Sequence, residues 1–108
     1  MADIYLPPSL KRVVQRYVRV FAPTRIVLFG SCAKGARRPN SDADLLVVMD
    51  FGADTSEIQR QARQLARDCF PPVDVVLAST TEVEEATVAV NPFLASILAT
   101  GITVYPQC

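Results

Sequence analysis

The sequence predicts one α/β (α+β) domain in which a small mixed sheet is flanked by helices. Short apolar runs of strand type alternate with stretches in which apolar residues recur at helical spacing, a pattern typical of layered domains of this class. The chain has 108 residues, half of them apolar, which is enough for one core but too few for two domains. We therefore expect residues 1–108 to form a single domain.

Helices are expected where apolar residues recur every three or four positions and where capping residues stand at the ends. In the first, Leu10 to Phe21, basic residues occupy most of the opposite face, and Pro23 follows its end. The expected helices are 10–21, one or two turns within 31–36, 55 to about 70, a short helix with Thr81 and Glu84 as a capping box, and one delimited by Asn91 and Gly101 with Pro92 at its first position.

Strands are expected at four short apolar runs, 25–29, 44–49, 73–78 and 102–105. The run from Leu45 to Val48 is continuously apolar rather than alternating, which predicts that both faces of that strand are covered. The last run is short and is expected at an edge of the sheet.

Composition excludes several kinds of chemistry. The chain has no histidine, which rules out Ser-His-Asp and Cys-His catalysis and any zinc site that contains histidine. Equal numbers of basic and acidic residues argue against binding to the backbone of nucleic acids. Cys32, Cys69 and Cys108 are odd in number and far apart, which indicates reduced thiols and a cytoplasmic location.

The last 23 residues, 86–108, contain no charged side chain. Asn91-Pro92 and Gly101 divide this stretch into short elements, so we do not expect it to span a membrane. It is either buried core or an apolar surface for a partner, and the sequence leaves both open.

A Gly-Ser pair, Gly30-Ser31, follows the first expected strand. Glycine lets the backbone turn sharply, and the amides at the start of the next turn then favour an anion such as phosphate. Ser31 adds a hydroxyl donor, and Lys34, Arg37 or Arg38 can supply positive charge near a triphosphate. An ordinary strand-to-helix turn has the same composition, so the pair is weak evidence by itself.

Three carboxylates strengthen the case for a site. Asp42 and Asp44 open the second strand, where residues i and i+2 share a face. Carboxylates so close repel each other unless a cation or proton intervenes, and Mg²⁺ prefers such oxygen ligands. Asp74 interrupts the apolar third strand and reaches the same place if that strand neighbours the second. A solvated turn, for the first two, and an edge-strand side chain facing water, for Asp74, are the alternatives.

The joint pattern resembles a known superfamily. Gly30-Ser31, ten intervening residues, Asp42-x-Asp44 and a later strand carboxylate at Asp74 are similar to the motif of the DNA polymerase beta nucleotidyltransferases. Residues 28–48 look like the minimal nucleotidyltransferase (MNT) domains in particular, many of which are MntA-type antitoxins of HEPN-domain toxins. Lys34 stands where an arginine is frequent, a departure that keeps the charge.

The resemblance implies a role for each matched residue. Asp42, Asp44 and Asp74 would be the catalytic residues and would hold Mg²⁺, with two ions expected. Gly30, Ser31 and Lys34 would bind the nucleotide, with ATP as the substrate.

It further implies a transfer of AMP to a hydroxyl of a cognate HEPN toxin, with which the chain would assemble. Binding to nucleic acid or to a membrane is not expected, for the reasons of charge and sequence given above. Two alternatives stay open. One is a non-catalytic antitoxin that neutralises its toxin by occlusion, and the other is a nucleotidyltransferase with a small-molecule acceptor.

Overall fold

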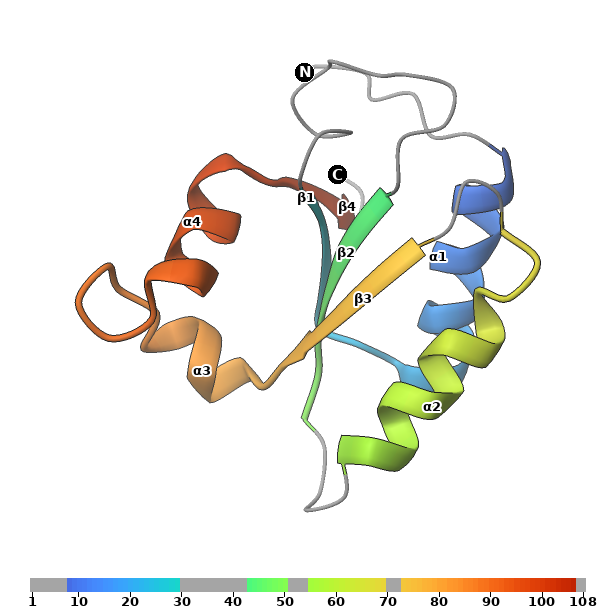
Figure 1. The fold of residues 1–108 in the computed structure, drawn as a ribbon, viewed down its shortest axis with the longest axis horizontal. Helices are drawn as coiled ribbons and strands as arrows, with labels where there is room; N and C mark the ends of the chain where they lie inside the picture. Colours follow the sequence, from blue (N-terminus) through green and yellow to red (C-terminus); the bar gives the residue numbers. More distant parts are fainter. Residues whose placement is uncertain (1–7, 30–42, 51–54, 70–72, 107–108) are drawn as a thin grey trace.

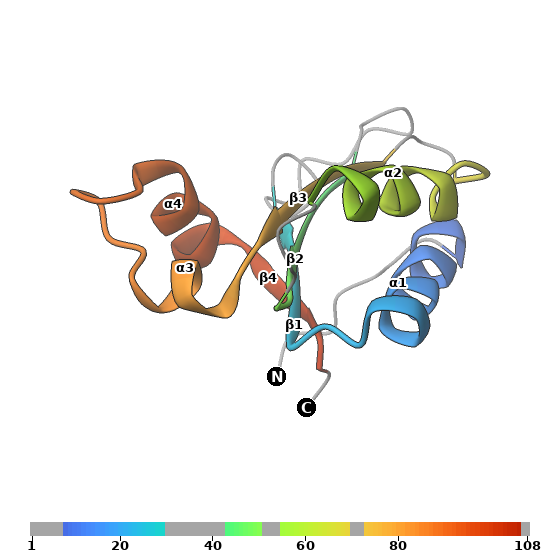
Figure 2. The ribbon, with the colours of Figure 1, turned by 90° about the horizontal axis from the view of Figure 1, so that it is seen from below.

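The computed structural model describes residues 8–29, 43–50, 55–69 and 73–106. Helices α1 and α2 cover one face of a four-stranded sheet, and α3 and α4 cover the other, so the fold has three layers (Figures 1 and 2). The described elements are α1 (Pro8–Phe21), β1 (Arg25–Phe29), β2 (Ala43–Val48), α2 (Thr55–Leu65), β3 (Val73–Ala78), α3 (Thr80–Glu84), α4 (Pro92–Thr100) and β4 (Ile102–Tyr105).

The sheet is mixed, with the strand order β3-β2-β1-β4. β2 and β3 run parallel and are joined through α2, whereas β1 is antiparallel to both of its neighbours. This is the small mixed sheet that the sequence predicts, with β4 at an edge as expected. β3 also neighbours β2, and this pairing is what the predicted proximity of Asp74 to Asp44 requires.

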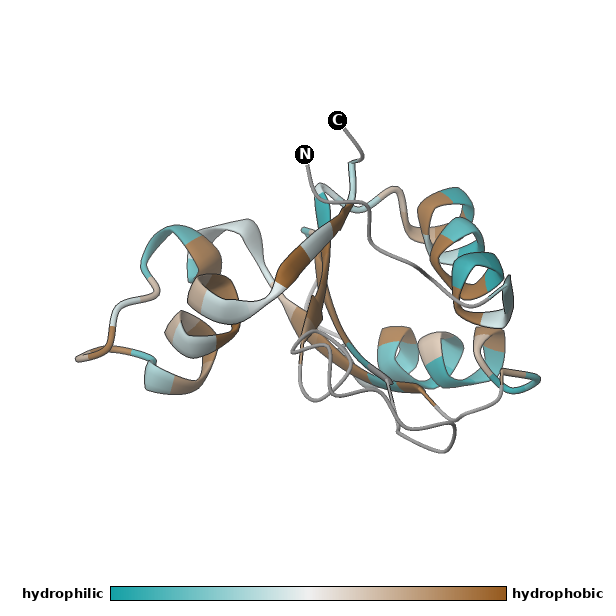
Figure 3. Ribbon diagram, turned by 90° about the horizontal axis from the view of Figure 1, so that it is seen from above, coloured by the Kyte–Doolittle hydropathy of each residue, from teal (hydrophilic) through white to brown (hydrophobic). Residues whose placement is uncertain are grey.

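The core has two parts because the sheet is covered on both faces. Leu45 and Val47 of β2 pack in the cluster beneath α1 and α2, while Leu46 and Val48 pack with α4 on the opposite face. All four are buried, which confirms that the continuous apolar run is a strand covered on both sides. Colouring by hydropathy shows the same division, with the apolar sides of the helices turned inward (Figure 3).

α1 is held by polar contacts as well as by packing. The buried Tyr17 hydroxyl donates a hydrogen bond of 2.7 Å to the carbonyl of Ala62 in α2. Burial raises the pKa of this hydroxyl well above its usual range. Arg16 donates to both oxygens of Asp68, at 2.6 and 3.0 Å.

Several expected boundaries differ from the structure. α1 begins at Pro8 rather than at Leu10, β2 spans Ala43–Val48 rather than 44–49, and the helical turns expected within 31–36 lie outside the described residues. α2 ends at Leu65 rather than near residue 70, because Arg16 donates to the Leu65 carbonyl at 2.8 Å and the following amides bond three residues back instead of four. The capping box of α3 is formed by Ser79 and Glu82, two residues before the expected pair. β3 ends at Ala78, and Ser79, the next residue, can already cap the following helix with its hydroxyl.

The boundaries of α4 agree with the prediction. Asn91 accepts a hydrogen bond from the Leu94 amide, Pro92 occupies the first helical position, and Gly101 follows the end. A Cβ at Gly101 would lie 2.5 Å from Cγ1 of Val27 and 2.6 Å from the Ile97 carbonyl oxygen, so the passage from α4 into β4 requires glycine. None of the helices in the described part of the chain has the length and apolar character needed to cross a bilayer.

Candidate active site

Asp44 and Asp74 are register partners on the neighbouring parallel strands β2 and β3. Neighbouring strands lie about 4.8 Å apart, and partners in register project to the same face. Side chains alternate along β2, so Asp44 shares a face with Leu46 and Val48, which is the face covered by α3 and α4. The fold therefore brings two of the three predicted carboxylates together on one face.

The two carboxylates differ in burial. Asp44 is half-buried, whereas Asp74 is exposed on β3, the last strand on its side of the sheet. The sequence argument that a carboxylate inside an apolar strand is costly to bury therefore does not apply to Asp74. Its candidacy rests on its register with Asp44.

The other predicted site residues lie outside the described part of the chain. They are Gly30, Ser31, Lys34 and Asp42. The segment that contains them joins Phe29 to Ala43, and Phe29 is the register partner of Asp44 on β1. Phe29 at the end of β1, Asp44 at the start of β2 and Asp74 at the start of β3 are therefore neighbours in the sheet. The phosphate-binding turn predicted from the sequence follows Phe29 in the chain.

The donor set present at this place suits a hard divalent cation. Two carboxylates in register on one face offer the oxygen ligands that Mg²⁺ prefers. Within the described residues no group of three potential metal ligands occurs, so a third protein ligand would have to come from elsewhere, as the sequence expects of Asp42. The Asp44–Asp74 pair fits the cation that the resemblance implies.

An aromatic pair beside Asp44 was not predicted from the sequence. The rings of Phe29 and Phe93 meet edge to face with centroids 6.2 Å apart, across β1 and α4. Phe93 is 59% exposed and shares the α3/α4 side of the sheet with Asp44. The sequence indicates only that Phe29 directly precedes the Gly-Ser pair, and it does not indicate that Phe93 is its neighbour.

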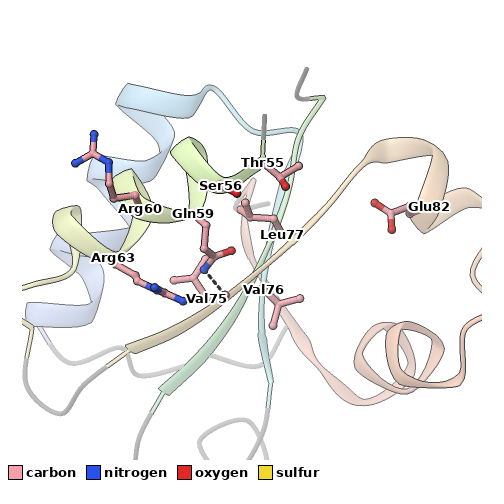
Figure 4. A pocket seen from close by; sticks show the side chains of 9 residues that line it. All are labelled: Thr55, Ser56, Gln59, Arg60, Arg63, Val75, Val76, Leu77 and Glu82. Carbon is pink, nitrogen blue, oxygen red and sulfur yellow. Dashed lines mark hydrogen bonds between the residues drawn. The ribbon is translucent and has the colours of Figure 1, made fainter. Parts of the chain in front are cut away.

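A separate groove follows the outer edge of β3 between α2 and α3, with a volume of about 810 Å³ (Figure 4). Val75, Val76 and Leu77 lie along it, and Gln59 of α2 donates a hydrogen bond of 3.0 Å to the Val75 carbonyl. The groove does not include Asp44 or Asp74. It is therefore not the place where the predicted carboxylates act.

Comparison with known proteins shows that this chain has a nucleotidyltransferase fold. Residues 8–96 match the family model for the nucleotidyltransferase domain. The chain belongs to this family, and the superfamily resemblance expected from the sequence is confirmed.

Among solved structures, the chain is similar to a toxin–antitoxin crystallised with AMP-PNP. The TM-score is 0.59 and the identity 23%, over 88% of this chain and 72% of the other. It is also similar to a putative nucleotidyltransferase from Sulfolobus solfataricus, with a TM-score of 0.49 and 23% identity over 73% and 71% of the two chains. The comparison with curated proteins found no match.

Proposed function

We propose that this nucleotidyltransferase domain transfers AMP from ATP to a hydroxyl group of a cognate HEPN toxin and acts as its antitoxin in the cytoplasm. The observation that carries the proposal is the register of Asp44 with Asp74 on one face of the sheet. The chain belongs to the nucleotidyltransferase family, and the two carboxylates on this face can hold a metal ion that also binds the phosphates of a nucleotide.

The proposed roles of the residues follow from their chemistry. Asp44 and Asp74, together with Asp42, would hold Mg²⁺, which when bound neutralises charge on the phosphates and on the oxygens that attack and leave. Gly30, Ser31 and Lys34 would bind the phosphates of ATP. What the chain itself contributes is placement, because two carboxylates anchored on paired strands are held in fixed relative positions.

A protein acceptor is supported by the surface beside the site. Val88, Val90 and Phe93 are 79%, 72% and 59% exposed, although the charge-free stretch they belong to also supplies Leu94, Ile97 and Val104 to the core. One part of this stretch is therefore buried core, as one alternative from the sequence has it, and the exposed part supports the other alternative, an apolar surface for a partner. An apolar surface at the tip of the α3–α4 hairpin is what a docking protein needs and what a small acceptor does not.

The toxin–antitoxin crystallised with AMP-PNP adds support of a different kind. A chain of that crystal structure shares the fold over 88% of this chain, and the structure contains AMP-PNP. For this chain, the toxin partner, the adenine nucleotide and the Mg²⁺ requirement are parts of the proposal.

The test is intact-mass spectrometry of the co-expressed toxin after incubation with this protein, ATP and Mg²⁺. We expect a mass increase equal to one or a few AMP groups, and a rate at least about 100-fold lower with Asp44→Asn. Asp50→Asn is the matched control, because Asp50 is an exposed aspartate that follows the opposite end of β2.

Two results would count against the proposal. An unmodified toxin that Asp44→Asn still neutralises would identify an antitoxin that works by occlusion. Transfer of AMP to a small hydroxyl compound but never to the toxin would identify a small-molecule transferase.

A further inference from the structure

A second groove lies at the opposite edge of the sheet from the groove along β3, between α1 and the edge strand β4. Its volume is about 590 Å³. Of the residues that the structure describes, five from one stripe of α1 and two from β4 line it: Lys11, Val14, Gln15, Val18, Arg19, Val104 and Tyr105. β4 ends the sheet on this side, so within the described residues its outer edge has no neighbouring strand.

The groove has an apolar floor between two cations. Val14 and Val104 are buried at its base, and Lys11 and Arg19 are exposed at its rim. None of its lining residues within the described part of the chain is acidic. α1 as a whole carries four basic residues and no acidic one, although the complete chain has a formal charge of zero. Arg16 is paired with Asp68, and the positive charge of the other three basic residues gives this helix a long-range attraction for an acidic ligand.

We propose that the groove between α1 and β4 binds an extended acidic segment of a partner protein. An extended chain suits the site because the outer edge of β4 offers backbone groups for hydrogen bonds, in the manner of strand addition. The proposal does not depend on nucleotidyl transfer, because neither Asp44 nor Asp74 lines this groove.

The spacing of the two cations predicts the sequence of the ligand. Lys11 and Arg19 are eight residues apart on a helix, a rise of about 12 Å. An extended chain advances about 3.3 Å per residue and presents every second side chain to the same face. Two acidic residues four positions apart therefore match the two cations, and the residue midway between them lies over Val14, Gln15 and Val18, two of which are apolar. The expected motif is acidic-x-apolar-x-acidic.

The test is a nuclear magnetic resonance titration of the ¹⁵N-labelled full chain with a synthetic peptide, Ser-Glu-Ser-Val-Ser-Glu-Ser. We expect saturable shifts of amide signals in α1 and β4. We expect the affinity to fall by about tenfold or more in the variant Lys11→Glu/Arg19→Glu. The matched control is Arg12→Glu, which reverses a charge on the same helix outside the groove and should leave the affinity within about twofold.

Several outcomes would overturn the proposal. One is the absence of saturable shifts at millimolar peptide with the wild-type chain. Another is equal binding of a peptide in which lysine replaces both glutamates, or equal loss of affinity in Arg12→Glu. Tighter binding of a ten-nucleotide single-stranded DNA at the same amides would show instead that the groove takes nucleic acid. Amide spectra of both variants report whether they fold, so a lost interaction is separable from a lost structure.

Discussion

Asp44 and Asp74 are partners in register and yet differ in exposure, because β2 is interior to the sheet and β3 is its edge. If the pair holds Mg²⁺, the ion should stabilise the folded chain by mass action, by about 1.4 kcal/mol at tenfold its dissociation constant. We expect Mg²⁺ with ATP to raise the melting temperature of the wild type and of Asp50→Asn, but not of Asp44→Asn or Asp74→Asn. Differential scanning fluorimetry measures this, and an unchanged response in both site variants would remove the pair from the metal site.

Tyr17 makes a prediction about alkaline pH. Its pKa is raised by burial, so the folded state keeps the proton at pH values where the unfolded chain has begun to lose it. The stabilisation is complete below the unfolded pKa of about 10 and declines as pH rises above that value. Tyr17→Phe should lose about 1 kcal/mol at neutral pH, since its hydrogen bond to Ala62 disappears. Urea unfolding at pH 7 and pH 11 should show a smaller difference from wild type at the higher pH. A difference independent of pH would contradict this assignment.

At the scale of elements, the sequence predicted strands and core well and helix ends less well. β1 and β3 lie where their apolar runs predicted, because a short apolar run bounded by turn-forming residues is visible in the sequence itself. The end of α2 was not predictable, because it depends on Arg16 reaching the Leu65 carbonyl from another helix. The same holds for the Phe29–Phe93 contact, which joins residues 64 positions apart in the chain. For the candidate site, the sequence predicted that Asp74 lies close to Asp44 only if the third strand neighbours the second. The order of strands in a sheet could not be predicted, because no local sequence pattern encodes it.

The start of α3 distinguishes two capping boxes that the sequence permits. Ser79 accepts a hydrogen bond from the Glu82 amide at 3.1 Å, and the Glu82 carboxylate accepts one from the Ser79 amide at 2.9 Å. Ser79→Ala should therefore cost about 1 kcal/mol of stability. Thr81→Ala is the matched control, and it should change stability by less than about 0.5 kcal/mol because Thr81 is exposed inside the helix. Denaturant unfolding of both variants decides between the boxes, and a larger cost for Thr81→Ala would favour the later one.

At the scale of the whole molecule, surface chemistry is divided between the two sides of the sheet. α1 gathers basic residues on one side, and the α3–α4 hairpin exposes apolar ones on the other, where the Asp44–Asp74 face also lies (Figures 1 and 3). The side that carries both the carboxylates and the apolar tip is therefore where we expect the proposed toxin to dock.

Replacing Val88 and Val90 with serine tests this division. Both side chains are more than 70% exposed, so Val88→Ser/Val90→Ser should leave the melting temperature of the isolated chain nearly unchanged. Burial of both against a partner contributes about 1.5–3 kcal/mol per side chain, so the affinity for the toxin should fall by tenfold or more. Val20→Ser is the matched control, since Val20 is a 52% exposed valine of α1 on the opposite side of the sheet. Calorimetric titration of the toxin with the three proteins measures the difference. Equal affinities for all three would place the toxin elsewhere, and a loss confined to Val20→Ser would place it on the α1 side.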